Sequence, residues 1–213
     1  MTRWRWVLFD LDGTLANTIP LIIASYDHAM RSVLGVPADR NEATRWIGQT
    51  LKHTFGTLHP DRAEELIEAY VEFNLRQMGA LIERYPGMVE LVDQLSLAGI
   101  GCGVATSKRR PAAELTLTHV GLEDHIAITV AMDDTDVHKP DPAPLRLALA
   151  RMGANPDESV YIGDAVVDVQ AAKAAGMAAI AVTWGAGEVD ALRAAAPTAV
   201  ATTTAQLRAL LLP

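Results

Sequence analysis

The chain has 213 residues, of which 50% are hydrophobic and 21% are charged, a balance that allows a buried core and excludes disorder of the whole chain. Its 18 Lys and Arg residues against 26 Asp and Glu residues give a net charge of −8, which disfavours nucleic-acid and anionic membrane partners. With a single cysteine, Cys102, and no apolar run near the ~18 residues of a membrane span, we expect a cytoplasmic protein.

Short apolar runs alternate with helical patterns along most of the chain. The runs are residues 7–9, 102–105, 126–130, 160–162, 179–182 and 198–201. They are continuously apolar, which is typical of strands that are covered on both faces of a parallel sheet. Apolar residues at helical spacing lie between them, at residues 88–97, 111–120, 144–152 and 167–175. The sequence therefore predicts an α/β fold with a doubly wound, Rossmann-like parallel sheet.

One stretch after the first predicted strand breaks this alternation. Residues 17–83 contain helical patterns, among them 20–34 and 63–78, and no convincing strand pattern. We therefore predict a core domain made of residues 1–16 and 84–213, with a small all-helical cap domain, residues 17–83, inserted after the first strand. The Gly13 turn and the run Tyr85, Pro86, Gly87 are the candidate hinges between them.

Polar residues gather directly after the predicted strands, at the edge where open parallel sheets bind ligands. They are Asp10, Asp12, Thr106, Ser107, Lys139, Asp164 and Asp168. Each of them alone has an ordinary interpretation as a turn residue, a helix cap or a solvated side chain. Their occurrence at one edge, from four separate segments, indicates a functional site.

Converging carboxylates at this edge would need a compensating charge. Two of them ~4 Å apart repel by about 4 kcal/mol even at an effective dielectric of 20. A divalent cation would neutralise them, and carboxylate ligands without His or Cys favour Mg²⁺. The Thr106 hydroxyl, the Ser107 N–H at a helix start and the Lys139 ammonium would then form a receptor for a small anion, so we predict a phosphoryl ligand.

The same residues resemble the four motifs of phosphatases of the haloacid dehalogenase superfamily, in the same order. Residues 10–14 match Asp-x-Asp-Gly-Thr, Thr106 matches the Ser or Thr of the second motif, Lys139 matches the third, and residues 163–168 match Gly-Asp-x-x-x-Asp. The helical insert looks like the cap of the subfamily that contains phosphoglycolate phosphatases, β-phosphoglucomutases and bacterial pyrophosphatases. In detail, it looks closest to the pyrophosphatase-type branch at Ile47, Gly48, Thr54, Phe55, Tyr70, Phe73 and Asn74.

This resemblance implies catalytic roles for Asp10, Asp12 and Lys139. Asp10 would attack phosphorus and form an aspartyl-phosphate, and Asp12 would donate a proton to the leaving oxygen and later accept one from water. The implied Mg²⁺ site consists of Asp10, Asp12 through its backbone carbonyl, Asp164 and Asp168, with Asp168 also a candidate to orient Lys139.

The resemblance also implies that the core binds the phosphoryl group through Thr106, Ser107 and Lys139, while the cap selects the substrate. The candidate substrate-binding residues of the cap are Arg45, Gly48, Gln49 and Lys52. A solvated helix face explains Arg45 and Lys52 equally well. Gly48 has a stronger claim to a close approach to the core or substrate, because a glycine within a helical pattern costs about 1 kcal/mol relative to alanine.

The leading hypothesis is thus a Mg²⁺-dependent phosphatase similar to phosphoglycolate phosphatases, acting on a small phosphorylated metabolite as a monomer or homodimer. Inorganic pyrophosphatase is the alternative, and both activities need the same core. A phosphosugar mutase ranks lower because Thr14 replaces the Val of typical mutases of this group. A haloacid dehalogenase ranks lower because it needs no acid at Asp12, and the intact Asp10 and Asp12 argue against a non-catalytic binding module.

Overall fold

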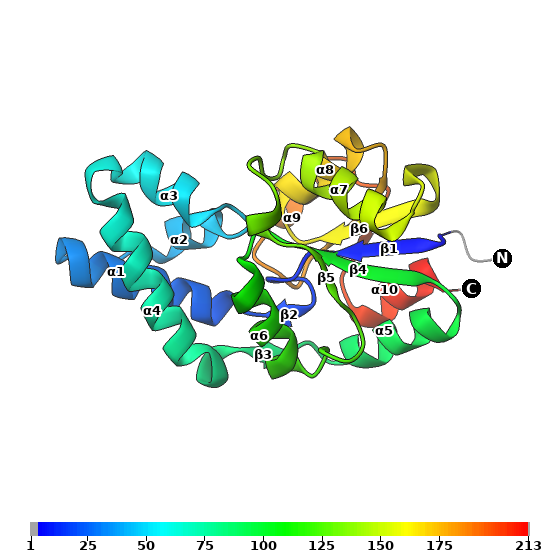
Figure 1. Ribbon diagram of the computed structural model, residues 1–213, viewed down its shortest axis with the longest axis horizontal. Coiled ribbons are helices and arrows are strands. Elements are labelled where there is room, and N and C mark those ends of the chain that lie inside the picture. Colours follow the sequence, from blue (N-terminus) through cyan, green and yellow to red (C-terminus); the bar gives the residue numbers. More distant parts are fainter. Residues whose placement is uncertain (1–3, 213) are drawn as a thin grey trace.

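A computed structural model of the chain describes residues 4–212 and contains one parallel sheet flanked by helices (Figure 1). Its strand order is β5-β4-β1-β6-β7-β8, and every neighbouring pair is parallel. The strands are β1 (Trp6–Phe9), β4 (Gly101–Ala105), β5 (Ile128–Val130), β6 (Ser159–Gly163), β7 (Ala178–Val182) and β8 (Ala199–Ala201). The predicted α/β fold with a Rossmann-like parallel sheet is therefore confirmed.

All six predicted strands are present in their predicted places along the chain, with small differences at their ends. The largest difference is in β5, which begins at Ile128 and not at residue 126. The reason is local, because the Ile126 N–H donates to the Leu122 carbonyl at 3.1 Å and so belongs to the turn after the preceding helix. Apolar character alone does not distinguish a buried turn residue from a strand residue.

The two faces of the sheet are covered by separate sets of helices. One face carries α5 (Met88–Leu97), α6 (Arg110–Val120) and α10 (Thr204–Leu211); the other carries α7 (Ala143–Met152), α8 (Val166–Ala174) and α9 (Val189–Ala194). Alternate residues of β1 serve both layers, because Val7 and Phe9 pack on the first side and Leu8 on the second. The patterns at 88–97, 111–120, 144–152 and 167–175 are confirmed as α5 to α8, whereas α9 and α10 were not predicted.

A helical unit, residues 19–81, lies beside one end of the sheet (Figure 1). It contains α1 (Ile19–Leu34), α2 (Arg40–Trp46), α3 (Leu51–Leu58) and α4 (Ala63–Leu81) and is joined to the rest by β2 (Ala16–Asn17) and β3 (Glu83–Arg84). These two strands form an antiparallel pair, which the sequence did not predict because two residues are too few to show periodicity. The division into domains at residues 16/17 and 83/84 passes through this pair and stays a prediction.

The helical unit has an apolar core of its own. Tyr26 lies at its centre and meets Trp46, Phe55 and Tyr70 edge-on, with ring centroids 4.9, 5.4 and 4.9 Å away. Such aromatic pairs add to the stabilisation that burial provides. Short 3-10 helices, η1 (Pro60–Arg62), η2 (Met132–Asp134) and η3 (Pro156–Glu158), complete the elements. Within residues 4–212, no helix combines the length and apolar character that crossing a membrane requires.

Candidate active site

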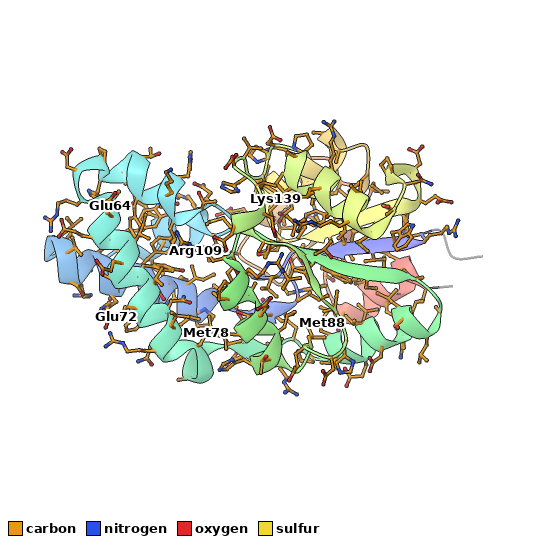
Figure 2. All side chains as sticks on the ribbon, viewed as in Figure 1. Glu64, Glu72, Met78, Met88, Arg109 and Lys139 are labelled. Carbon is orange, nitrogen blue, oxygen red and sulfur yellow. The ribbon has the colours of Figure 1, made fainter. Side chains whose placement is uncertain are left out.

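Lys139 lies at the centre of a buried polar cluster at the carboxyl ends of β1 and β6, the end of the sheet nearest the helical unit (Figure 2). Its ammonium contacts Asp10 Oδ1 at 2.8 Å, Asp168 Oδ1 at 2.6 Å and the Tyr161 hydroxyl at 2.9 Å. The Tyr161 hydroxyl in turn donates to the carbonyl of Ala105 at 2.7 Å. The ammonium of Lys139 thus joins its own loop to the end of β1 and to the β6–α8 segment, and Tyr161 extends the network to the end of β4.

The neighbouring backbone fixes the carboxylates that hold Lys139. The Asp10 N–H donates to the Ile162 carbonyl at 2.8 Å, which places Asp10 directly after β1 and beside the end of β6. Asp168, in the first turn of α8, accepts the Ala165 N–H on Oδ2 at 3.0 Å, a favourable position for an acid at a helix start. A Cβ at Gly163 would collide with the Asp168 carboxyl group, so glycine permits this close approach.

Three acidic residues at this edge could hold a metal ion. Asp10, Asp164 and Asp168 each offer an oxygen, and these oxygens lie within 4.8 Å of one another. Asp164 is fixed by the Ala186 N–H on Oδ2 at 2.7 Å and by the Thr14 hydroxyl on Oδ1 at 3.4 Å. An all-carboxylate donor set fits Mg²⁺ better than Zn²⁺.

The role predicted for Asp12 at the metal site uses its backbone carbonyl and stays a prediction, and its carboxylate is not part of this group of three. Its Oδ1 instead accepts a charged hydrogen bond from Lys108 Nζ at 2.8 Å. The pair is only partly exposed, at 10% for Lys108 and 15% for Asp12. The carboxylate predicted to carry the proton is thus paired with Lys108, whereas Asp10 and Asp168 are paired with Lys139.

The cluster carries more negative charge than its lysine neutralises. Burial raises the pKa of Asp10 to about 7, with Asp168 and Asp12 adding to the rise and Lys139 opposing it. Burial, then Asp168 and Asp10, raise the pKa of Asp164 well above its usual value. Burial alone would lower the pKa of Lys139, but the facing carboxylates outweigh it and raise that pKa, so the ammonium stays charged. A bound dication is the compensation that this arrangement favours.

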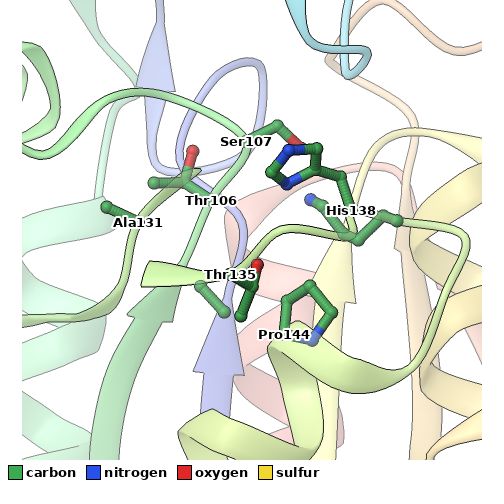
Figure 3. A pocket seen from close by; sticks show the side chains of 8 residues that line it. Thr106, Ser107, Ala131, Thr135, His138 and Pro144 are labelled. Atoms are coloured by element: carbon green, nitrogen blue, oxygen red, sulfur yellow. The ribbon is translucent and has the colours of Figure 1, made fainter. Parts of the chain in front are cut away.

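The residues predicted to bind the phosphoryl group lie beside this cluster. Figure 3 shows Thr106, Ser107 and His138 around a small cavity of about 10 Å³, room for about one water molecule. The Thr106 hydroxyl accepts the Lys108 N–H at 3.1 Å. Ser107 is not at a helix start as predicted, because α6 begins at Arg110. The loop after β4, and not a helix terminus, therefore presents the N–H groups at this position.

A larger cavity of about 380 Å³ lies between the helical unit and the sheet edge, with Asp10 and Asp12 among the residues that line it. Of the four predicted cap residues, Gly48, Gln49 and Lys52 line this cavity. Arg45 does not line it and is exposed on the last turn of α2, because the adjacent Trp46 takes the cavity side and successive helical residues point about 100° apart. The solvated alternative therefore describes Arg45.

Gly48 connects α2 and α3 where the helical unit approaches the core. Its φ of +89° lies in the left-handed region that favours glycine. A Cβ at this position would be 3.4 Å from the Ala165 Cβ and 3.7 Å from Val167 Cγ2, at the start of α8. This is the close approach to the core that a glycine at this position indicates.

The sequence analysis assigned no role to two residues that contact the site. Tyr161 lies inside the apolar run of β6, and nothing in that run distinguishes it from a core residue. Lys108 follows Thr106 and Ser107, and its position after a strand was the one signal that could have assigned it to the site. Both residues act through a predicted site residue, Tyr161 on Lys139 and Lys108 on Asp12.

The fold and the buried acidic cluster define an α/β enzyme with an aspartate–lysine centre at the carboxyl edge of its sheet. The family profile described as haloacid dehalogenase-like hydrolase matches residues 7–182. Pyrophosphatase PpaX of Bacillus velezensis is 37% identical over 178 residues, which cover 84% of this chain and 82% of that protein. The PpaX protein of Bacillus pumilus is 36% identical over 178 residues, which again cover 84% of this chain and 82% of that protein.

Solved structures give the same result. A hydrolase from Pseudomonas syringae superposes with a TM-score of 0.83 at 28% identity and covers 92% of this chain and 93% of its own. A protein from Haemophilus somnus, described as a predicted phosphoglycolate phosphatase, has a TM-score of 0.88 at 22% identity over all of both chains, a likeness of fold. The chain therefore belongs to the haloacid dehalogenase-like hydrolase family, and phosphatase is its class of activity.

Proposed function

We propose that this protein is a Mg²⁺-dependent phosphatase that hydrolyses a small phosphorylated metabolite, in the manner of phosphoglycolate phosphatases, through an aspartyl-phosphate on Asp10. The observation that carries this proposal is the contact of Lys139 with both Asp10 and Asp168, beside Asp164. A purely structural lysine would need one carboxylate, whereas this cluster retains an excess of buried acids.

In the proposed first step, an Asp10 oxygen attacks phosphorus while the ester bond to the leaving group breaks. Asp12 donates its proton to the departing oxygen, for which its place on the cavity wall two residues from Asp10 is suitable. Lys139, with the Thr106 hydroxyl and the loop at Ser107, would stabilise the charge on the transferring phosphoryl oxygens. Asp168 and Tyr161 position Lys139 for this role.

In the proposed second step, Asp12 accepts a proton from a water molecule, which attacks the phosphorus of the aspartyl-phosphate. The bond between phosphorus and Asp10 breaks, and inorganic phosphate leaves with the Asp10 carboxylate restored. Asp10, Asp164 and Asp168, with the backbone carbonyl of Asp12, would hold the metal. When bound, Mg²⁺ would neutralise the carboxylates and polarise a phosphoryl oxygen.

Inorganic pyrophosphate is the second candidate substrate. The observation that favours it is the similarity to the PpaX proteins, which are named pyrophosphatases. The same Asp10 and Asp12 chemistry would serve, with phosphate as the leaving group. The two substrates differ only beyond the transferred phosphoryl group, where the helical unit lines the cavity.

Phosphate release from phosphoglycolate, pyrophosphate, sugar phosphates and nucleotides, with and without Mg²⁺, tests both proposals. We expect turnover that requires Mg²⁺ and falls at least about a thousandfold in Asp10→Asn, because the nucleophile is lost. Asp190→Asn is the matched control, since the Asp190 carboxylate is fully exposed. Wild-type turnover in a folded Asp10→Asn protein would show that Asp10 is not the nucleophile.

A further inference from the structure

The cavity above Asp10 and Asp12 has two unlike halves. The core half presents the acids and the loop after β4, whereas the half formed by the helical unit is largely apolar. The apolar residues of that half are Ile22, Tyr26, Trp46, Ile47, Leu51, Ile67, Tyr70, Val71 and Leu75. A volume of about 380 Å³ with a mostly apolar lining and a few polar groups is typical of a site for an organic ligand.

The apolar half is held in place by its own packing. Tyr26 is 1% exposed and meets Trp46 and Tyr70 edge-on at 4.9 Å each, so these rings are braced before any ligand binds. Asn74, also on this side, donates its amide to the Ser25 hydroxyl at 3.1 Å and is itself buried. These buried rings therefore hold the apolar wall in place, and a preset wall binds an apolar group at a lower entropic cost of ordering side chains.

The positive charges around the cavity are already paired or lie at its rim. Lys139 and Lys108 are held by Asp10, Asp168 and Asp12. Lys52 is exposed, and the Arg109 side chain is 62% exposed with Asp133 at 3.9 Å. A second anionic group, such as the far phosphate of pyrophosphate, would therefore find cations only at the rim, through Lys52 and Arg109, and would face the apolar wall deeper in the cavity, where burial without a partner is costly.

We infer that the preferred substrate is an organic phosphate monoester whose leaving group carries an apolar body, and that the apolar wall of the helical unit binds this body. The inference rests on the proposed phosphatase function and assigns the leaving-group class of the same site. Asp12, on the floor of the cavity, protonates the ester oxygen as it departs, and the apolar alcohol leaves through the cavity that bound it.

The test compares 3-phenylpropyl phosphate with propyl phosphate in the presence of Mg²⁺. Both release a primary alcohol of similar acidity, so the chemical step is alike and the phenyl ring adds apolar contact alone. Burying a ring of this size is worth a factor of about ten or more, which we expect in kcat/KM and mainly through KM. Pyrophosphate is measured beside them and is expected to have a lower kcat/KM than the phenyl ester.

Leu51→Asn and Leu58→Asn form a matched pair on α3. Leu51 lines the cavity, whereas Leu58 is 42% exposed and lies outside its lining. The advantage of the phenyl ester should fall several-fold in Leu51→Asn and persist in Leu58→Asn. Val71→Thr, a near-isosteric change in the same wall, replaces Leu51→Asn if thermal melting shows that the latter does not fold.

The outcomes separate this inference from the phosphatase function on which it rests. Equal kcat/KM values for the two esters, or a higher value for pyrophosphate, would overturn the substrate class while leaving a phosphatase. If neither these esters nor any substrate of the phosphatase screen is hydrolysed, the proposed function is wrong, and calorimetry with the corresponding non-hydrolysable phosphonates decides the inference. Tighter binding of the phenyl compound by about tenfold would support binding by the apolar wall, and equal binding would exclude it.

Discussion

The sheet edge and the helical unit each bury a cluster, but of opposite chemistry. At the sheet edge, Lys139 joins the carboxylates of Asp10 and Asp168, which come from two separate segments, and the cluster is stabilised by hydrogen bonds and charge compensation. In the helical unit, Tyr26 joins neighbouring rings and the stabilisation comes from apolar burial. The contrast separates two tasks, because the charged cluster suits phosphoryl chemistry and the aromatic cluster suits selection of the leaving group.

The two clusters also differ in how a substitution changes the free energy of unfolding. A buried charged cluster is costly when one partner is removed, since the remaining charges stay desolvated. An aromatic cluster loses contacts in proportion to the volume removed. Substitutions can therefore test whether the two regions have separate tasks.

Lys139→Met should have the largest effect. Without the ammonium, Asp10 and Asp168 face each other uncompensated, so we expect a loss of about 3–5 kcal/mol in the free energy of unfolding. Activity should fall at least about a hundredfold if Lys139 stabilises the phosphoryl charge as proposed, because that group is lost. Urea unfolding at pH 7 and phosphate release measure the two effects.

Lys173→Met is the control for this substitution. Lys173 donates to the carbonyls of Ala195 and Ala196 at 3.0 and 3.2 Å on the exposed surface, with no acid involved. We expect little change in stability or activity. If Lys139→Met were as stable and active as this control, the ammonium would not be what holds the charged cluster together.

Phe9→Leu and Phe55→Leu form the next test, since both rings are fully buried and lie in different regions. Each should cost about 1–2 kcal/mol of stability. Phe9 precedes Asp10 in β1, so its replacement should lower kcat by disturbing the nucleophile. Phe55 packs against Tyr26 behind the cavity wall, so its replacement should raise KM and leave kcat close to wild type.

Steady-state kinetics on one substrate, with thermal melting of both variants, decides between these outcomes. Equal effects of the two substitutions on kcat would mean that the helical unit takes part in the chemical step. The assignment of chemistry to one region and selectivity to the other would then be wrong.

The sequence predicted the parts of the molecule in which one residue type has a strong local signal. Continuous apolar runs predicted the strands of the sheet. The polar residues after these strands, which are acids, a lysine and hydroxyls, indicated the site that the structure shows around Lys139. The catalytic roles of these residues stay predictions. Their convergence was predictable because a parallel sheet gathers the residues that follow its strands at one edge.

Features that depend on packing could not be predicted in this way. Tyr161 has the same sequence environment as any core residue of β6, and only the approach of Lys139 gives its hydroxyl a role. Ile67 and Val71 show the apolar spacing of a core helix, and the way α4 packs leaves them facing a cavity. Arg45 was placed near the substrate because spacing along the chain does not show which way a helix turns.

The smallest effect is expected for Asp134→Asn. Asp134 belongs to a second charged cluster, which shares no residue with the acidic group of Asp10, Asp164 and Asp168. Its carboxylate accepts hydrogen bonds from Arg110 at 2.6 Å, Arg151 at 3.1 Å and the Ala131 N–H at 2.7 Å. Burial raises its pKa, but these donors outweigh burial and lower the pKa to about 2. Solvent at the two partly exposed arginines screens part of this stabilisation. We therefore expect Asp134→Asn to lower the free energy of unfolding by about 1 kcal/mol at pH 7.

The sign of the pH dependence distinguishes this cluster from the one around Lys139. A carboxyl group whose pKa is lower in the folded chain stabilises the fold above its unfolded pKa, near 4. That stabilisation is lost as the pH falls from about 4 to about 2, so urea unfolding should show wild type and Asp134→Asn converging over this range. Asp10, whose pKa is raised, favours the folded state at low pH instead and loses that contribution as the pH rises toward 7. A constant difference between wild type and Asp134→Asn from pH 7 to pH 2 would mean that shape, and not charge, explains the role of Asp134.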